Sequence, residues 1–541
     1  MDLTRRGFFT TAGLAAGSAA LFGMMDLTGC AAQNGGETEQ TQETTEEAST
    51  DATSESVDNT VTYDKVDVQK ATADEVKAVL TGSDTTTLLV DARPQEAYAG
   101  WALEGASRGG HLAGALLFSA RWLDCDYKLE TPRADLLKRE MDAQNITSSS
   151  AVIVYDYTGE QATKTAQYLV SQGVKNCRVF QANGLIDGET ALEQDDNYQY
   201  FVPSEIVKSV SDVKTGAATE LSAEAKELFG DNLDALVIAD IGWGNIHESS
   251  YLSVGHVPGA IHVNTDCYER PRVYVPEKRS DYAKEWRLIS VEEFRDDVCP
   301  RYGITKDSTV IITGSSESPE ARFAFMLRTL GVKVYVMSAC LNAWNYNGYP
   351  LDTEADTLVV PTSVESFGTQ EIAHPDEILW MDDILAILAG DAEGQVVDNR
   401  GEDEWKGEYS GYSYHDLSGH IDGTFWCEQA DNFLNADGGV RTRPEYEKLL
   451  EDAGLDLTKI MAFFCGDSWG AAGISYLCQS TGLMNVKEWG NGWIPWSNMG
   501  YEFIDHQGRR VHYDRWQDTV VDENGNDARD GVNILDDAPA E

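Results

Sequence analysis

The chain has 541 residues, of which 42% are hydrophobic and 10% aromatic, which is enough for several domains with ordinary cores. Its 91 acidic residues outnumber its 41 basic ones and give a net charge of −50, which argues against nucleic-acid binding because phosphate contacts need clustered Lys and Arg. The nine cysteines include no Cys-x-x-Cys pair, so neither a disulfide framework nor a zinc site is indicated.

The N-terminus predicts export from the cytoplasm. Residues 4–9 (TRRGFF) form a twin-arginine pattern, and a Gly- and Ala-rich stretch follows it. This stretch ends in a Leu-Thr-Gly-Cys sequence that resembles a lipobox, which predicts lipid modification of Cys30. We therefore expect a signal at 1–30 and a protein that faces the periplasm or the cell exterior, held to the membrane only through its lipid anchor.

A disordered acidic linker is predicted at 31–61, because its Glu, Thr, Ser and Gln residues cannot bury enough apolar surface to fold. Beyond the signal, no other stretch is long and apolar enough to cross a bilayer.

Three similar segments follow the linker. In each, a Val- and Leu-rich strand ends in Asp, and a Gly-His segment with a small-residue turn comes after it. Three copies of one pattern indicate an internal repeat. The strands lie at residues 88–91, 236–240 and 396–398, and the Gly-His segments at 110–115, 255–260 and 419–424.

Each repeat continues with a strand, a helix and another strand, which favours parallel pairing with right-handed crossovers. The apolar runs and helical spacings predict these elements at 152–155, 161–172 and 177–180, then 310–312, 320–330 and 333–337, and finally 461–464, 471–480 and 485–488.

In each repeat, one residue follows the first strand of this strand-helix-strand segment, and its type differs between the repeats. It is Asp156 in the first, Gly314 in the second and Cys465 in the third. A strand that ends at Cys465 puts the sulfur at the carboxyl edge of the sheet, where N–H groups of the turn and the helix N-terminus surround it. Such a setting is expected to lower the thiol pKa. The alternative is that Cys465 is a small buried hydrophobe.

These motifs resemble the rhodanese family of sulfurtransferases, and residues 488–496 (EWGNGWIPW) resemble the closing segment of that family. The three-unit layout is similar to that of three-domain periplasmic thiosulfate sulfurtransferases. The resemblance implies an α/β fold of three tandem rhodanese-like domains, each a mainly parallel sheet flanked by helices. We place the first unit at 62–200 and the second at 201–360, both inactive, the catalytic third unit at 361–510, and an acidic tail at 511–541.

The same resemblance implies the chemistry. A small donor, thiosulfate-like or mercaptopyruvate-like, transfers its sulfane sulfur to Cys465, and a thiol or cyanide acceptor then removes it, without a metal or organic cofactor. Asp398 and Arg400 are expected to form a supporting structural pair beneath the loop. The loop residues expected to bind the transferred sulfur are Gly466, Asp467, Ser468, Trp469, Gly470 and Ala471.

Some residues depart from the family pattern and make thiosulfate, a dianion, a poor donor. Glu404 stands where thiosulfate and mercaptopyruvate enzymes tend to carry an arginine, Asp467 adds a negative charge to the loop, and Gly470 replaces an arginine of the three-domain relatives. The candidate sources of positive charge are Lys406, Arg441, Arg443 and residues 268–286, although a surface role is favoured for the three single side chains.

Two other classes of protein stay open. A Cys-dependent phosphatase or arsenate reductase needs an arginine that closes a Cys-x5-Arg loop, and Ala471 occupies that position. A persulfide carrier or binding module would instead exchange sulfur with a protein partner at the outer face of the membrane. In either case the first and second units are expected to pack against the third, with the second closest.

Overall fold

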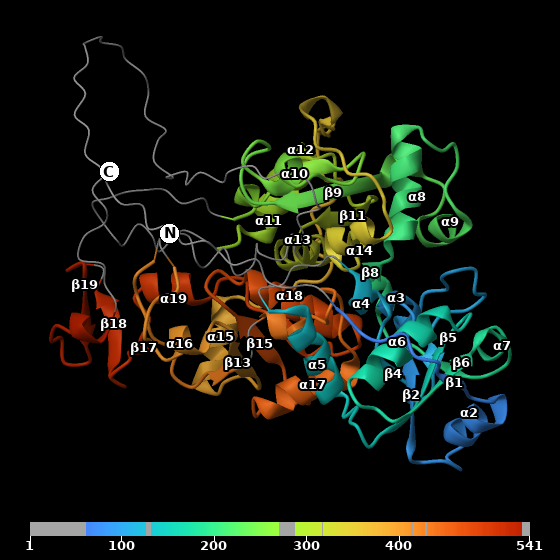
Figure 1. Ribbon diagram of the computed structural model, residues 1–541. Coiled ribbons are helices and arrows are strands. Elements are labelled where there is room, and N and C mark those ends of the chain that lie inside the picture. Colours follow the sequence, from blue (N-terminus) through green and yellow to red (C-terminus); the bar gives the residue numbers. More distant parts are fainter. Residues whose placement is uncertain are drawn as a thin grey trace, which may run out of the picture.

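The structure is a computed structural model, and it describes residues 61–125, 131–269, 287–315, 317–412, 415–427, 430–514 and 516–532 (Figure 1). The predicted signal, the lipid site at Cys30 and the acidic linker up to residue 60 lie outside the described residues. Among the helices that are described, none is both long and apolar enough to span a membrane.

The first unit is built on a five-stranded parallel sheet in the order β1-β6-β5-β2-β4. Its strands are β1 (Gln69–Lys70), β2 (Thr87–Asp91), β4 (Leu116–Leu117), β5 (Ala151–Asp156) and β6 (Asn176–Gln181), with an antiparallel pair β3 (His111–Leu112) and β7 (Leu192–Glu193) beside it. Its helices are α2 (Ala73–Leu80), α3 (Gln95–Ala99), α4 (Arg121–Asp124), α5 (Arg133–Ala143), α6 (Glu160–Ser171) and α7 (Asn183–Ile186).

The central strand β5 shows why helices cover both faces of this sheet. Its side chains alternate between the faces, and all of them from Val152 onward are buried. Val152 and Val154 pack with Leu169 of α6, whereas Tyr155 belongs to a different cluster that includes Val76 of α2.

The second unit repeats this sheet in the order β8-β12-β11-β9-β10, again with parallel strands. The strands are β8 (Phe201–Val202), β9 (Leu236–Gly242), β10 (Ile261–Asn264), β11 (Thr309–Gly314) and β12 (Lys333–Met337). The helices are α8 (Ser204–Thr215), α9 (Ala223–Phe229), α10 (Ser250–Ser253), α11 (Val291–Glu293), α12 (Cys299–Arg301), α13 (Glu317–Thr329) and α14 (Cys340–Tyr346).

The third unit has the parallel order β16-β15-β13-β14, which corresponds to β6-β5-β2-β4 of the first. Its strands are β13 (Gln395–Asp398), β14 (Phe425–Trp426), β15 (Met461–Phe464) and β16 (Val486–Glu488). Its helices are α15 (Met381–Ala389), α16 (Glu402–Trp405), α17 (Arg443–Asp452), α18 (Trp469–Ser480) and α19 (Trp493–Asn498). Three repeated parallel sheets flanked by helices confirm the predicted α/β fold class.

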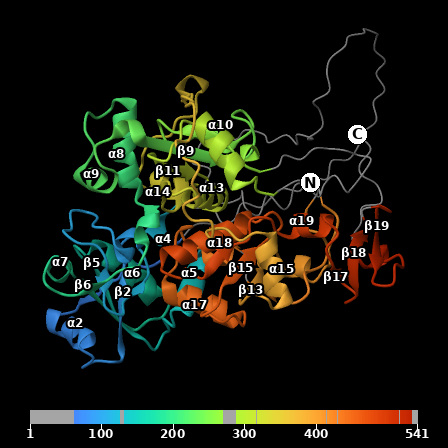
Figure 2. The ribbon, with the colours of Figure 1, turned by 180° about the vertical axis from the view of Figure 1, so that it is seen from behind.

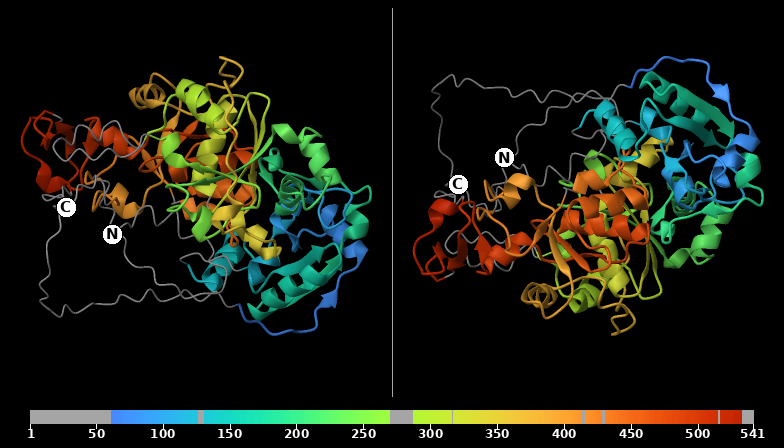
Figure 3. Two further views of the ribbon diagram at one scale, coloured as in Figure 1. Left: turned by 90° about the horizontal axis from the view of Figure 1, so that it is seen from above. Right: turned by 90° about the horizontal axis from the view of Figure 1, so that it is seen from below.

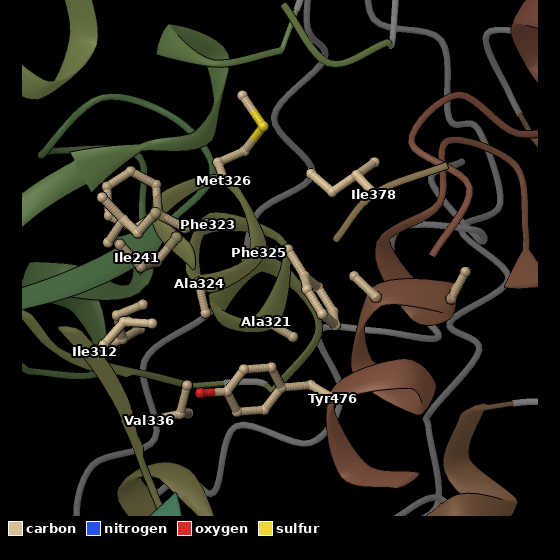
Figure 4. Packing of buried hydrophobic residues seen from close by; sticks show 14 of the residues in the cluster. Ile241, Ile312, Ala321, Phe323, Ala324, Phe325, Met326, Val336, Ile378 and Tyr476 are labelled. Carbon is tan, nitrogen blue, oxygen red and sulfur yellow. The ribbon is translucent and has the colours of Figure 1, made fainter. Parts of the chain in front are cut away.

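The second and third units share one hydrophobic core. Helix α13 of the second unit packs along α18 of the third, and buried residues of both units belong to a single cluster. Figure 4 shows Phe325 and Ala321 of α13 turned toward the side of Tyr476, which comes from α18. The second unit therefore lies directly against the third, as the sequence predicts.

The first unit contacts the third through arginines and through Ala436, which is buried in the hydrophobic cluster of the first unit. Arg133 donates to the carbonyl of Ala436, and Arg139 donates to the carbonyl of Leu434 at 2.7 Å. Both arginines lie on α5, which runs beside α17 and α18 in the views from either side (Figures 1 and 2).

The prediction of an acidic tail from residue 511 is wrong for residues 511–514 and 516–532, which are folded. Strands β17 (Phe503–Ile504), β18 (Arg510–Asp514) and β19 (Thr519–Asp522) form an antiparallel sheet. Val511, Tyr513 and Val520 are buried against the third unit because they alternate with polar residues and face its core. This sheet lies at the end of the molecule away from the first unit (Figure 3).

Candidate active site

Cys465 lies where the sequence places it, directly after β15 and before α18, at the carboxyl edge of the third sheet. Its side chain is only 3% exposed. Ser468, at the N-cap of α18, has a left-handed backbone with φ of 72°, and the N–H groups of Gly470 and Ala471 are directed at the sulfur. The structure thus has the predicted strand, loop and helix N-terminus around this thiol.

The expectation that the surroundings of Cys465 lower its thiol pKa is wrong. Complete burial raises the pKa of Cys465 to about 12, and the Asp467 carboxylate raises it further. The Gly470 and Ala471 N–H groups and the Arg322 guanidinium lower it, but they do not outweigh the loss of water around the sulfur. Cys465 is therefore a neutral thiol at pH 7.

The N-terminus of helix α19 binds the loop that holds Cys465. The N–H of Trp493 donates to the carbonyl of Cys465, and the N–H of Ile494 donates to the carbonyl of Gly466, both at 2.9 Å. Gly492 has a φ of 89°, and a Cβ there would lie 2.8 Å from the Cys465 carbonyl oxygen. A glycine is therefore required at 492 for the two segments to approach.

Asp398 and Arg400 form the predicted structural pair. The Arg400 Nε donates to Asp398 at 3.0 Å, and its terminal nitrogen donates to Asp398 and to the Gly419 carbonyl, both at 2.7 Å. The Arg400 guanidinium also lies 4.4 Å from the centre of the Trp493 ring. Since Trp493 binds the Cys465 carbonyl, the pair supports the loop from beneath, and neither member contacts the sulfur.

Trp469 and Ser468 differ in their hydrogen-bond partners. The Trp469 indole N–H donates to the Glu269 carboxylate of the second unit, so Trp469 packs against the neighbouring unit. The Ser468 hydroxyl is buried and has no hydrogen-bond partner in the part of the chain that the structure describes. Its proposed role as a donor to the transferred sulfur stays a prediction.

Arg322 is the cation that the sequence interpretation missed. It lies on α13 of the second unit, is fully buried, and donates to the carbonyls of Asp467 and Gly490 of the third unit, the latter at 2.9 Å. The available signal was an arginine within an apolar helical run, Ala321 to Met326, where a charge is unexpected.

The predicted cations lie elsewhere. Lys406 pairs on the surface with Glu402 at 2.7 Å, and Arg443 pairs with Glu447 at 2.8 Å. Arg441 is not a surface residue, because its buried guanidinium binds Glu140 of the first unit at 3.1 Å. Most of the predicted basic loop, residues 270–286, lies outside the described residues.

Glu404 and Tyr412 flank the site on the side of Arg400. The Glu404 carboxylate is 8% exposed and accepts the Gly401 N–H at 2.9 Å, and its other oxygen finds no partner among the described residues. Burial raises the Glu404 pKa to about 7, against the opposing effect of Arg400. The Tyr412 hydroxyl lies so close to Gly466 that a Cβ at 466 would overlap it.

The equivalent loops of the other units are filled by carboxylates. In the first unit Asp156 accepts the N–H groups of Gly159 and Gln161, the latter at 2.7 Å, at the start of α6. In the second unit a side chain at Gly314 would overlap the Glu320 carboxylate, which also accepts from the Cys340 thiol at 3.0 Å.

Eight cysteines are described, and no disulfide joins any two of them. Over the same residues no group of three or more His, Cys, Asp or Glu side chains is placed to hold a metal ion.

Comparisons with known proteins agree with this architecture. The family model of the rhodanese-like domain matches residues 72–182 and 222–347, which are the units that lack Cys465. The thiosulfate sulfurtransferase YnjE of Escherichia coli K12 is 24% identical over 417 residues, covering 76% of this chain and 86% of that protein.

Solved structures of EanB match with a TM-score of 0.66. The wild-type structure is 25% identical and covers 81% of this chain and 97% of that chain. The complex of the Chlorobium limicola anaerobic ergothioneine biosynthesis enzyme with trimethyl histidine matches over 80% of this chain with the same identity and TM-score. Residues 72–182 and 222–347 of the chain are thus rhodanese-like domains, and the chain is a sulfur-transferring enzyme.

Proposed function

We propose that Cys465 is the nucleophile of this sulfurtransferase and carries the sulfur as a persulfide. The observation that carries the proposal is that, of the three equivalent loops, the third alone directs its N–H groups at a sulfur. In the structural relatives, one EanB structure is described as holding a cysteine persulfide.

The reaction is a double displacement. The Cys465 thiol first loses its proton to a base in the solvent, and the resulting thiolate attacks the sulfane sulfur of a donor. The bond from that sulfur to the rest of the donor breaks, and its electron pair leaves with the rest of the donor, for example as sulfite from thiosulfate. An acceptor thiolate or cyanide then attacks the outer sulfur and releases the Cys465 thiolate. The Gly470 and Ala471 N–H groups stabilise the anionic sulfur in both steps as preorganised dipoles.

The charges near the loop favour a donor with less negative charge than thiosulfate. Asp467 adds negative charge at the loop, and Glu404 ionises near pH 7 on the Arg400 side. A mercaptopyruvate-like donor, with a single carboxylate, carries less charge to be repelled. The export route and the lipid anchor at Cys30 belong to the proposal on the strength of the sequence pattern.

A cationic acceptor is a second candidate. The EanB relative was solved with trimethyl histidine, which carries a quaternary ammonium group. A carboxylate at Glu404, in place of an arginine, complements such a cation, whereas it opposes an anionic substrate. A protein acceptor at the membrane surface is the remaining alternative and corresponds to the carrier function.

The test is intact-mass spectrometry of the full chain beside Cys465→Ala. Each is incubated with thiosulfate, mercaptopyruvate or polysulfide, and then with cyanide, a small thiol or trimethyl histidine. We expect wild type to gain one sulfur atom that an acceptor removes, and the variant to gain none. Loading without discharge to any small acceptor would favour the carrier function, and no loading from any donor would contradict the proposal.

A further inference from the structure

One buried arginine joins the second unit to the loop that holds Cys465. Arg322 is 0% exposed and belongs to α13, whereas both of its carbonyl partners belong to the third unit. Asp467 lies two residues after Cys465, and Gly490 lies three residues before Trp493, whose N–H donates to the Cys465 carbonyl. A single guanidinium therefore bridges the two segments that form the loop and its closing turn.

The hydrogen bond to Asp467 also fixes an N–H group. In a trans peptide the C=O and the following N–H point in opposite directions. Arg322 holds the Asp467 carbonyl on the side of the second unit, so the Ser468 N–H is directed to the opposite side of the loop backbone. The orientation of this part of the loop thus depends on a residue of the neighbouring unit.

The charge of Arg322 is only partly neutralised by its neighbours. Glu269 lies 3.4 Å and Glu488 lies 3.7 Å from the guanidinium. Glu488 is fully buried, neither of its oxygens has a hydrogen-bond partner among the described residues, and burial raises its pKa to about 8. Burial disfavours the charged form of Glu488, so Glu269 is the main counterion of Arg322, and the guanidinium still lowers the pKa of the Cys465 thiol, which Asp467 raises.

We propose that Arg322 is a positioning residue for the reaction at Cys465, so that the second unit completes the active loop of the third although it has no nucleophile of its own. It holds Asp467 and Gly490 in place and supplies positive charge near the sulfur. This inference rests on the proposed role of Cys465.

The test compares three variants of the full chain. Arg322→Met removes both the charge and the bridge, and Arg322→Lys keeps the charge but cannot bind two separated carbonyls with a planar fork. Arg328→Met is the matched control, because Arg328 lies on the same helix and at the same boundary, 4.4 Å from the Tyr200 ring and 3.0 Å from Glu377.

Two readouts separate positioning from stability. The first is the pH dependence of iodoacetamide alkylation, followed on the peptide that contains Cys465. The second is the kcat and KM of persulfide transfer with the donor that loads wild type best. Thermal unfolding of each variant is recorded alongside, because a purely structural arginine affects only this measurement.

For Arg322→Met we expect alkylation at pH 8 to slow by about threefold to tenfold, since the thiol pKa rises, and kcat to fall by about tenfold or more. For Arg322→Lys we expect near-normal alkylation and a reduced kcat, and this variant decides the question if the Met variant does not fold. Arg328→Met is expected to leave both readouts within about twofold of wild type.

The inference is overturned if the Arg322 variants keep the wild-type alkylation profile and kcat, or if Arg328→Met changes both as strongly. Failure of the proposed function is a separate result, in which wild type itself gains no sulfur. The alkylation comparison then still reports whether Arg322 acts on the Cys465 thiol.

Discussion

The loops after β5, β11 and β15 occupy equivalent positions in three sheets but differ in what lies within them. In the first, the Asp156 carboxylate accepts the N–H groups at the start of α6. In the second, the Glu320 carboxylate fills the space over Gly314. In the third, the N–H groups face the Cys465 sulfur. The third loop therefore differs from the other two in that it holds a sulfur where they hold a carboxylate.

The Asp-x-Arg motif shows a second difference between the units. Asp91 pairs with Arg93 in the first unit and Asp398 pairs with Arg400 in the third, at 2.6 and 2.7 Å. In the second unit the arginine position is Gly242, and burial raises the pKa of the remaining Asp240 to about 8. The second unit thus has the buried aspartate of the motif but no arginine at the partner position.

Exchange of the loop residues should give the largest contrast between the units. Cys465→Ser is expected to lower sulfur transfer by about a thousandfold or more, because the hydroxyl is a far weaker nucleophile for sulfur. Asp156→Ala is expected to leave transfer unchanged and to lower the free energy of unfolding by about 1 kcal/mol, since two N–H groups lose their acceptor. Steady-state transfer assays and thermal unfolding measure the two effects. Comparable loss of transfer in Asp156→Ala would show that the first loop takes part.

Replacement of each motif aspartate by asparagine should change the free energy of unfolding, and the two changes should have opposite signs. Asp398→Asn is expected to destabilise the protein by about 3 to 5 kcal/mol, because it leaves the buried Arg400 without a counterion. Asp240→Asn is expected to stabilise it by about 2 to 4 kcal/mol at pH 8, since it removes a carboxyl whose ionisation is disfavoured by burial.

The pH dependence of this stabilisation follows from the raised pKa of Asp240. The folded state holds its proton up to about pH 8 whereas the unfolded chain loses it near pH 4, so stability falls as the pH rises between these values. The gain in Asp240→Asn should therefore be larger at pH 8 than at pH 5 in urea denaturation. An equal gain at both values would mean that Asp240 is ionised in the folded protein.

Removal of charge beside Cys465 should sharpen the contrast between the third loop and the others. In Asp467→Asn we expect a lower thiol pKa, and alkylation of the Cys465 peptide at pH 8 faster by about threefold to tenfold. Asp456→Asn, at an exposed loop position before β15, is the control and should alkylate like wild type. An unchanged rate in Asp467→Asn would assign the high pKa to burial alone.

The smallest predicted effect concerns Glu404. Because its pKa is about 7, the carboxylate ionises between pH 6 and 8, and the KM for thiosulfate should rise over this range in wild type. Glu404→Gln should lower that KM at pH 8 by about threefold and flatten its pH dependence, whereas Glu402→Gln, an exposed change on the same helix, should not. An identical pH profile in Glu404→Gln would place the donor away from this carboxylate.

The sequence was sufficient for the elements that local patterns determine. The predicted strands at 333–337 and 461–464 coincide with β12 and β15, because continuous apolar runs between turns are typical of buried parallel strands. The Asp398–Arg400 pair and the position of Cys465 were also correctly predicted, since both are set by residues close together in the chain.

What the sequence could not predict arises from packing between distant segments. Arg322 reaches the Cys465 loop only because α13 lies along α18, and nothing in the local pattern of either helix specifies that contact. The raised pKa of Cys465 also depends on packing, because burial of the loop removes water from the sulfur. The hairpin of β18 and β19 was missed because its acidic surface residues obscured the alternation of Val511 and Tyr513.

The central claim is that the third loop is the one that carries sulfur. The most direct measurement is peptide mapping by mass spectrometry after the full chain is loaded with polysulfide, with every cysteine peptide quantified. The account predicts added sulfur on the Cys465 peptide, removed by an acceptor, and no acceptor-dependent change on the peptide of Cys340, the cysteine beside the second loop. Transferable sulfur on Cys340, or an unmodified Cys465, would contradict it.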